Sequence, residues 1–377
     1  MSTTDPDSIA FPQTSTRDPE ATRRALERWL GTVLPEGASP RISHFDAPDT
    51  NGMSSETVLF DVTWRDRDEE QTWPLVARIA PDPGNVPVFP EYDLERQALT
   101  MRTVAALSDV PVPTVHWSEG DLRVLGAPFF VMERVEGVVP PDILPYNFMS
   151  FLTDASPDDR RRLQEATVHV LARLHAIEGV EEMFHFLPGA TNEQSALQRH
   201  VDEQRAYYEW VVADGRRSPL IEAAFQWLDQ RWPSEESPPV LSWGDARIGN
   251  VLYRDFEPVA VLDWEMAALG PAELDVAWMI TLHAFFEEVA KTYGLPGLPD
   301  FLRRDDVVAQ YEALTGRQLR DLDFYCTYAA TRHAIIMSRI GRRAIHFGEA
   351  EEPDDIDDLI THRAMLEAML EDRYWSA

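Results

Sequence analysis

The chain has 377 residues, of which 44% are hydrophobic, and its 65 acidic and 34 basic residues give a formal net charge of −31. This length suits two domains of ordinary size, since domains cluster at about 100–200 residues. The negative balance argues against nucleic acid and against an anionic membrane surface as partners, because both require a basic footprint. It is compatible with a cationic substrate, and equally with solubility alone.

Two further features of the sequence indicate the cellular compartment of the protein. The chain contains one cysteine, Cys326, so it has neither an intrachain disulfide nor a cysteine-based zinc site. No apolar run approaches the roughly 20 residues of a membrane-spanning helix, and the polar first residues do not resemble a secretory signal. We therefore expect a cytoplasmic protein.

The N-terminal part of the chain is predicted to be rich in strands. Residues 1–17 are expected to form a disordered tail. Asp18-Pro19-Glu20 then gives a helix start, with a capping residue, a proline at the first helical position and an acid in the first turn. The β-rich runs Thr57–Trp64 and Trp73–Ile79 are predicted to be two strands joined by a charged loop.

Two features of this part suit a nucleotide. Ser54 and Ser55 end a small-residue turn that enters a strand; such a turn can lay backbone N–H groups over phosphates, or it can be a plain hairpin turn. Arg78 is a cation within an apolar strand, and the next predicted helix, residues 91–107, offers Glu95 as its partner. Kinases use such a strand-to-helix ion pair to hold phosphates. In the alternative interpretation Arg78 points to solvent from an edge strand.

The boundary between the two predicted lobes lies near residue 136. The run Ala127–Gly137 passes from a buried strand into a turn. We expect residues 18–136 to form the nucleotide-binding lobe and residues 137–377 a larger lobe with the substrate site. The backbone around Glu133 and Val135 is predicted to hydrogen-bond an adenine edge.

The rest of the chain is predicted to be mainly helical. A helix begins at Ser156-Pro157, and His175 at its end is expected to be a hydrogen-bonded structural histidine rather than a ligand. The acidic run Glu349–Asp358 is predicted to be a solvated loop. Further helices are predicted over residues 198–212, 219–232 and 305–347.

The most informative stretch lies inside this helical part. Two short apolar runs, residues 251–253 and 260–262, flank a turn and predict a β-hairpin. Asp245 and Asn250 precede the hairpin, with the spacing D-x-x-x-x-N, and Asp263 follows it. Because a hairpin brings its two ends together, we expect these three side chains to converge.

Three converging oxygen donors suit a phosphoryl-transfer site. Mg²⁺ prefers carboxylate and amide oxygens and usually arrives with substrate phosphates. Asp245 would then accept the proton of a substrate hydroxyl, while Asn250 and Asp263 would hold Mg²⁺ against a nucleotide. Arg247 is placed to contact the phosphate in transit or an anionic substrate, and Asp275, at the start of an apolar helix, to anchor the loop of Asp245 by accepting backbone N–H bonds. The alternative is that these are ordinary polar loop residues.

With these motifs the chain resembles the aminoglycoside phosphotransferase and choline kinase-like superfamily. Within it, the chain is similar to the bacterial phosphotransferase branch related to the kinase-like domains of acyl-CoA dehydrogenase family members 10 and 11. The likeness runs from about Trp29 to about Arg343. It is most specific over Trp243-Gly244-Asp245, Asn250, Leu262-Asp263-Trp264-Glu265 and Asp275, with support from Gly52–Thr57, Leu75–Ile79, Glu95, Pro128–Gly137 and Leu171–His175.

The resemblance implies an α+β, protein-kinase-like bilobal fold with ATP and Mg²⁺ in the cleft. By position it makes Asp245 the catalytic base, and Asn250 and Asp263 the metal ligands. It makes Arg78 the phosphate-binding cation and Glu95 the partner of that cation.

Two departures from the family pattern lead to two functional hypotheses. Trp243 stands where the family usually has His, and we expect it to brace the loop by packing; Arg78 stands where Lys is usual. The first hypothesis is an ATP- and Mg²⁺-dependent kinase acting on a small hydroxyl substrate, either an aminoglycoside or an endogenous metabolite such as a hydroxyacyl thioester or an amino alcohol. The second is a pseudokinase-like nucleotide-binding module with a regulatory role, against which the intact catalytic motif argues.

Overall fold

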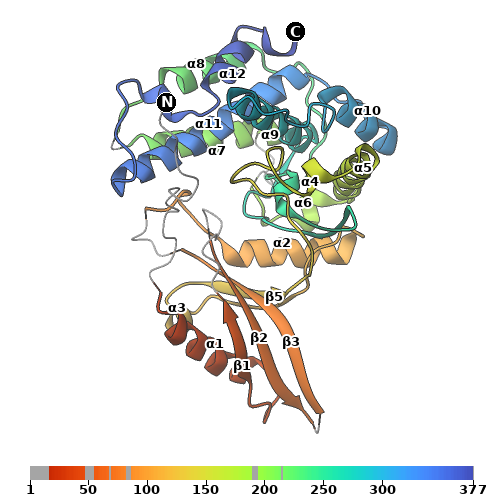
Figure 1. Cartoon of the computed structure of the whole chain (residues 1–377), viewed down its shortest axis with the longest axis vertical. Helices are drawn as coiled ribbons and strands as arrows, with labels where there is room; N and C mark the ends of the chain where they lie inside the picture. Colours follow the sequence, from red (N-terminus) through yellow and green to blue (C-terminus); the bar gives the residue numbers. More distant parts are fainter. Residues whose placement is uncertain are drawn as a thin grey trace. The chain divides into compact units, whose positions relative to one another are not determined.

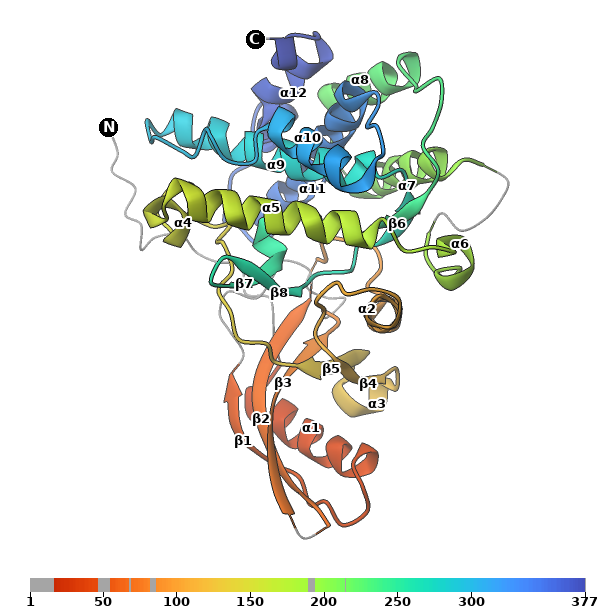
Figure 2. The ribbon, with the colours of Figure 1, turned by 90° about the vertical axis from the view of Figure 1, so that its right-hand side faces the viewer.

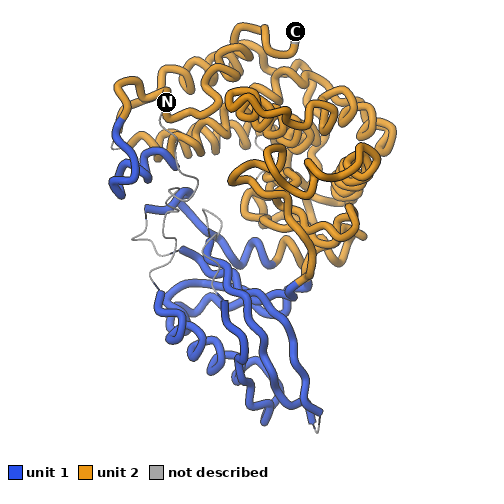
Figure 3. Tube along the Cα trace, viewed as in Figure 1, with its two compact units in different colours: residues 1–98, 114–134, 340–352 blue, residues 99–113, 135–339, 353–377 orange. Residues whose placement is uncertain are grey.

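The computed structural model describes residues 17–46, 55–67, 69–81, 86–188, 194–213 and 215–376. The chain divides into two compact units, shown in Figure 3. Unit 1 comprises residues 1–98, 114–134 and 340–352, and unit 2 comprises residues 99–113, 135–339 and 353–377. The chain thus changes unit after residue 134, near the predicted boundary at residue 136, but two further segments cross between the units.

Unit 1 is built around an antiparallel sheet whose strands are visible in Figure 1. Its strands are β1 (Arg41–Asp46), β2 (Glu56–Asp66), β3 (Glu69–Ile79), β4 (Val115–Glu119) and β5 (Phe129–Glu133), in the spatial order β1-β2-β3-β5-β4. Alternate residues of β2 are buried, including Phe60 and Val62, which are fully inaccessible to solvent. This period of two places one face of the strand against the core.

The two predicted strands of this region are confirmed, but both are longer than expected. The residues assigned to a charged loop continue the ladder, with Arg65 opposite Glu70 and Asp66 opposite Glu69. Exposed, oppositely charged side chains such as Arg65 and Glu70 stabilise the solvated end of a hairpin when they face each other across it. A run of charge therefore did not mark the end of the strands.

The first helix, α1 (Pro19–Val33), begins where the sequence predicts, because the Asp18 carboxylate accepts the amide of Ala21. It packs on the sheet through Trp29, whose ring lies 4.7 Å from the ring of Phe129. The predicted tail of residues 1–17 lies outside the described residues except for Arg17. That residue is not part of a free tail, since its Nε lies 3.1 Å from Glu56.

Helix α2 (Leu94–Leu107) begins three residues later than predicted and belongs to unit 1 up to residue 98. Asp93 sets this start, because its carboxylate accepts the amide of Arg96. The short helix α3 (Leu122–Leu125) is capped in the same way by Asp121.

Unit 2 is mainly helical, as Figure 2 shows. Its α-helices are α4 (Phe151–Asp154), α5 (Pro157–Leu174), α6 (Val180–Met183), α7 (Ala196–Val211), α8 (Pro219–Gln230), α9 (Glu273–Thr292), α10 (Arg304–Thr315), α11 (Leu322–His346) and α12 (Arg363–Leu370). The last residues of α11 fall in unit 1. The helices predicted at Ser156-Pro157 and over residues 198–212, 219–232 and 305–347 are confirmed, the last as two helices.

Two small antiparallel sheets interrupt the helices of unit 2. One pairs β6 (Val240–Ser242) with β9 (Ala268–Gly270), and the other pairs β7 (Val251–Arg254) with β8 (Glu257–Val261). The second is the predicted hairpin. Its turn is shorter than expected, because Asp255 and Phe256 adopt positive φ angles of 52° and 65° and close it with two residues.

The predicted solvated acidic loop is wrong at one position. Asp357 lies in the 3₁₀-helix η4 (Ile356–Leu359) and is only 5% exposed. Its carboxylate accepts the hydroxyl of Ser218, the N-cap of α8, and the amide of Leu220 at 3.2 Å. The first amides of a helix need acceptors, and for α8 a distant segment of the chain supplies the Asp357 carboxylate as an acceptor.

Across the described parts of the chain, no helix combines the length and the apolar character needed to cross a membrane. The remaining short elements are the 3₁₀-helices η3 (Ile248–Asn250) and η5 (Tyr374–Ser376).

Candidate active site

The loop between β6 and β7 carries Asp245, and Asp275 on the first turn of α9 holds this loop through hydrogen bonds. One carboxylate oxygen of Asp275 accepts the amide of Gly244 at 2.9 Å and the hydroxyl of Ser242 at 2.7 Å. The other accepts the amide of Trp243 at 2.7 Å and faces His175 Nε2 at 3.0 Å. The predicted anchoring role of Asp275 is thus confirmed in its contacts.

The protonation of this anchor follows from its partners. Burial alone would raise the pKa of Asp275, but the hydrogen bond and charge of His175, with the bonds from Gly244 and Ser242, outweigh burial and hold the pKa below its ordinary value. His175 also contacts the Tyr311 hydroxyl at 2.8 Å through Nδ1. His175 is therefore a hydrogen-bonded structural residue, as predicted.

Trp243 braces the loop by more than the packing we expected. Its ring is fully buried beside Trp264, with the ring centroids 6.1 Å apart. Its indole nitrogen donates to the carbonyl of Leu262 at 2.9 Å, which ties the loop before the hairpin to the residue that precedes Asp263.

Gly244 is required by geometry at this point of the loop. Its φ is +90°, which L side chains rarely adopt, and a Cβ there would lie 2.0 Å from the carbonyl oxygen of Met266. The backbone can approach Met266 this closely only without a side chain.

Two of the three predicted oxygen donors, Asp245 and Asn250, contact each other in unit 2. The side-chain amide of Asn250 donates to the carboxylate of Asp245 at 2.6 Å and to its carbonyl at 3.1 Å. The carbonyl of Asn250 accepts the amide of Leu262 at 2.8 Å, which brings the backbone next to Asp263 alongside. Asp263 adopts a positive φ of 58°, an uncommon conformation that functional sites often hold.

The donor set suits a hard cation that brings ligands of its own. The Asn250 side-chain nitrogen faces Asp245, which leaves its amide oxygen without that contact, and the Asp263 side chain is half-buried. In the described residues, no group of three or more His, Cys, Asp or Glu side chains is arranged to hold a metal. Two protein oxygens fit Mg²⁺, which commonly takes one or two protein ligands and completes its shell with phosphates and water.

Arg247 lies between two carboxylates. Its Nε is 3.1 Å from each oxygen of Asp245, and its Nη1 donates to Asp142. Burial alone would lower the pKa of Arg247, but these two acids outweigh it and raise the pKa. Sequence reasoning did not find Asp142, which lies 105 residues away in a loop without a recognisable motif.

Two further contacts of this loop were also missed. The indole nitrogen of Trp278, on α9, donates to Asp245 at 2.7 Å. The guanidinium of Arg332, on α11, donates to the carbonyl of Gly244 at 3.0 Å. Trp278 follows Asp275 by three residues, so the helical i, i+3 relation was the signal that could have found it.

The candidate residues of unit 1 are less closely grouped. Arg78 donates to the hydroxyl of Thr57, which lies opposite it on β2, at 3.0 Å. Glu95 is exposed in the first turn of α2, and its pairing with Arg78 stays a prediction.

The other predicted nucleotide contacts lie at the ends of strands. Ser54 lies outside the described residues. The Ser55 hydroxyl is buried, and no partner for it occurs among the residues that the structure describes. The amide of Glu133 already donates to the carbonyl of Thr114 at 2.9 Å, as expected inside a sheet.

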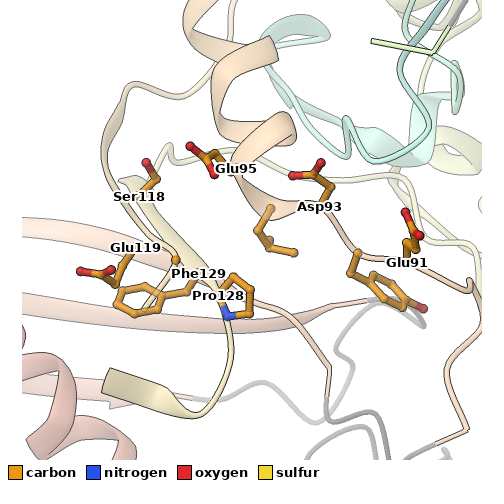
Figure 4. A pocket seen from close by; sticks show the side chains of 10 residues that line it. Glu91, Asp93, Glu95, Ser118, Glu119, Pro128 and Phe129 are labelled. Atoms are coloured by element: carbon orange, nitrogen blue, oxygen red, sulfur yellow. The ribbon is translucent and has the colours of Figure 1, made fainter. Parts of the chain in front are cut away.

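Unit 1 also contains a cavity of about 550 Å³ beside the start of α2. Figure 4 shows the carboxylates of Glu91, Asp93 and Glu95 along one side, with Pro128 and Phe129 close by. Asp93 caps α2 and therefore has a structural role at this place.

A comparison with protein families identifies the chain. The model of the phosphotransferase enzyme family matches residues 48–306, which include the segment from β6 to α9 but not Arg332 or Tyr311. The chain belongs to the phosphotransferase enzyme family. The loop anchored by Asp275 lies inside the matched range.

Curated relatives are similar over part of their length. The chain is 25% identical over 336 residues to acyl-CoA dehydrogenase family member 10 of Mus musculus, which covers 85% of the chain and 28% of that protein. It is 25% identical over 271 residues to the probable acyl-CoA dehydrogenase IBR3 of Arabidopsis thaliana, covering 67% of the chain and 31% of that protein. The chain thus spans about a third of the length of these relatives.

Solved structures share the fold. A putative aminoglycoside phosphotransferase from Ralstonia eutropha superposes with a TM-score of 0.65 at 22% identity, covering 94% of this chain and 98% of that one. An aminoglycoside phosphotransferase APH(4)-Ia variant, in a ternary complex with AMP-PNP and hygromycin B, gives a TM-score of 0.54 at 14% identity, covering 92% and 98%. These likenesses confirm the predicted α+β, aminoglycoside-kinase type of fold.

Proposed function

We propose that the protein is an ATP- and Mg²⁺-dependent kinase of small hydroxyl-bearing molecules, with Asp245 as its base. One observation carries the proposal. The Asn250 side chain bonds the Asp245 carboxylate at 2.6 Å while its backbone bonds Leu262, the neighbour of Asp263. Phosphoryl transfer needs a base close to metal-ligating oxygens, and we infer that Asp263, which follows Leu262, supplies the second of these oxygens.

Each residue of the site has a separate role in the proposed reaction. Asp245 accepts the proton of the substrate hydroxyl, and its hydrogen bonds from Asn250 and Trp278 fix the direction of its free lone pairs. The oxygens of Asn250 and Asp263 hold Mg²⁺, which when bound neutralises charge on the transferring phosphoryl group. Arg247 stabilises the same charge on the phosphoryl group once the bound substrate weakens the hydrogen bonds from Arg247 to Asp245 and Asp142.

Nucleotide contacts from unit 1 remain part of the proposal. Arg78 supplies a guanidinium for the phosphates, and Ser55 supplies a buried hydroxyl beside the turn where its strand begins. The backbone at Glu133 and Val135 would form hydrogen bonds with the adenine ring of the nucleotide. The AMP-PNP complex of the structural neighbour supports a nucleoside triphosphate as the donor.

Two substrate classes are compatible with the chain. The net charge of −31 favours a cationic acceptor such as an aminoglycoside, and hygromycin B is bound by one structural neighbour. The similarity to acyl-CoA dehydrogenase family members favours an endogenous metabolite such as a hydroxyacyl thioester. Both carry a hydroxyl group, which is what Asp245 requires.

The test is ATP consumption over a panel of aminoglycosides, amino alcohols and hydroxyacyl thioesters. Replacing Asp245 with Asn should abolish transfer to the best acceptor while ATP binding persists, because Asn cannot accept the proton. Asp323→Asn is the control, since Asp323 is an exposed acid of unit 2 paired with Arg304. Unchanged turnover in Asp245→Asn would refute the role of Asp245. ATP binding without turnover on any acceptor would favour the pseudokinase-like module instead.

A further inference from the structure

The carboxylate of Asp245 is held by more donors than the family motif supplies. Asn250 donates to Oδ2 at 2.6 Å, and Arg247 Nε lies 3.1 Å from both oxygens. The indole N–H of Trp278 donates to Oδ1 at 2.7 Å from a different helix. The indole contact is charge-assisted and short, which marks it as one of the stronger bonds of the site.

Trp278 is itself held in place. Its side chain is 3% exposed, and the guanidinium of Arg332 lies over its ring at 4.8 Å from the centroid. Arg332 also donates to the carbonyl of Gly244 at 3.0 Å, so one cation fixes both the indole and the backbone next to Asp245. Arg332 is 5% exposed, and burial lowers its pKa, while the charges of Asp245 and Asp275 among others oppose the decrease.

The first two turns of α9 therefore contact the loop at two points. Asp275 accepts the backbone amides of Trp243 and Gly244, and Trp278, one helical turn later, donates to the Asp245 side chain. A helix face is rigid over this distance. Helix α9 thus contributes both to the position of the loop and to the rotation of the carboxylate.

An indole suits this task for a chemical reason. A carboxylate offers about four lone-pair positions, and Trp278 and Asn250 occupy one on each oxygen. Both donors are neutral, so they orient the carboxylate without competing for its negative charge as a second cation would. Arg247 Nε faces both oxygens at 3.1 Å, and the lone pairs that it leaves when substrate displaces it keep a defined direction toward an incoming hydroxyl.

We propose that Trp278 is a positioning residue that orients Asp245 for proton transfer, and that Arg332 holds the indole in that orientation. The inference rests on the proposed role of Asp245 as the base. It assigns a catalytic consequence to a residue outside the motif that joins Asp245, Asn250 and Asp263.

The test is Trp278→Phe, which removes the N–H and keeps most of the ring. With Mg·ATP and water as the acceptor, phosphate release should fall about 10- to 100-fold in kcat, with the KM for ATP unchanged, because only the base has lost a partner.

Trp227→Phe is a closely matched control. Trp227 lies on α8, is 7% exposed, and carries the guanidinium of Arg231 at 4.5 Å from its ring. Its indole nitrogen has no hydrogen-bond partner in the described residues. Its replacement should leave kcat and the KM for ATP unchanged. Trp278→Phe behaving like Trp227→Phe, while Asp245→Asn abolishes release, would overturn the inference and leave the proposed function standing.

A second measurement does not depend on turnover or on the folding of Trp278→Phe. In the indole ¹H–¹⁵N spectrum, the Trp278 signal of the wild-type protein should move in Asp245→Asn, whereas the Trp227 signal should not. A Trp278 signal that does not move in Asp245→Asn would overturn the inference. Retained turnover in Asp245→Asn would instead refute the base, and the positioning role with it.

Discussion

The replacement of Asp275 by Asn tests how the active-site loop is held. Four donors converge on this carboxylate, from Ser242, Trp243, Gly244 and His175. Ser242 and Gly244 share one oxygen of Asp275, and Trp243 and His175 share the other. The side-chain amide of Asn keeps an oxygen for one of these pairs and places an NH₂ group opposite the other pair. A hydroxyl can rotate to accept, but a backbone amide cannot, so either orientation leaves the amide of Trp243 or of Gly244 buried without an acceptor.

The expected cost follows from that count. One stranded buried donor costs about 1–3 kcal/mol, and the remaining bonds lose their charge assistance. The free energy of unfolding should therefore fall by about 3–5 kcal/mol, the range for breaking a buried ionic network. Asp275→Asn should also lower turnover, because Asp245 lies on the loop that this substitution loosens. Urea unfolding followed by tryptophan fluorescence measures the first effect and phosphate release the second.

Asp357→Asn provides the comparison. Asp357 is also buried and also accepts a hydroxyl and a backbone amide, from Ser218 and Leu220. Here the amide oxygen can keep the backbone bond while Ser218 rotates, so the cost should be about 1 kcal/mol with turnover unchanged. Equal destabilisation by Asp275→Asn and Asp357→Asn would refute the reasoning.

Three further predictions concern the same unit. Gly244→Ala should destabilise the protein by at least about 3 kcal/mol through backbone strain and a clash, whereas Gly316→Ala, at φ +67° with open space around its Cβ, should cost about 1–2 kcal/mol in urea unfolding. Arg247→Met should lower Mg·ATP turnover about 100-fold, the typical cost of removing one donor to a transferring group, and less than about 10-fold would contradict that role. Burial lowers the pKa of His283 to about 4, so its neutral form is favoured in the fold; stability is complete above pH 6.5 and is lost as pH falls toward 4, at about 1.4 kcal/mol per pH unit for this group. Unfolding at stepped pH values should show this slope, and His283→Gln should reduce it.

Local chemistry explains which elements the sequence could predict. Helix starts such as Asp18-Pro19 and Ser156-Pro157 depend on a capping side chain within three residues of its partner, so they are legible from short stretches. The convergence of Asp245 with Asn250 follows from spacing inside a single loop and its hairpin. These are the parts in which prediction and structure agree.

Contacts between distant segments could not be predicted in the same way. Arg332 lies 88 residues from Gly244, and Asp142 lies 105 residues from Arg247. Neither belongs to a periodic pattern that points to its partner. The burial of Asp357 has the same origin, since its partner Ser218 is 139 residues away. In each case tertiary packing decides which donor or acceptor meets the polar group.

The most direct test of the central claim is the dependence of nucleotide binding on magnesium. Isothermal titration of AMP-PNP, with Mg²⁺ and with chelator, should show at least about tenfold tighter binding with Mg²⁺ in the wild-type protein, equivalent to about 1.4 kcal/mol. In Asp263→Asn this difference should disappear, while Asp323→Asn should retain it. AMP-PNP binding that ignores Mg²⁺ in the wild-type protein, or that keeps its Mg²⁺ dependence in Asp263→Asn, would contradict a metal site formed by Asn250 and Asp263 beside the base.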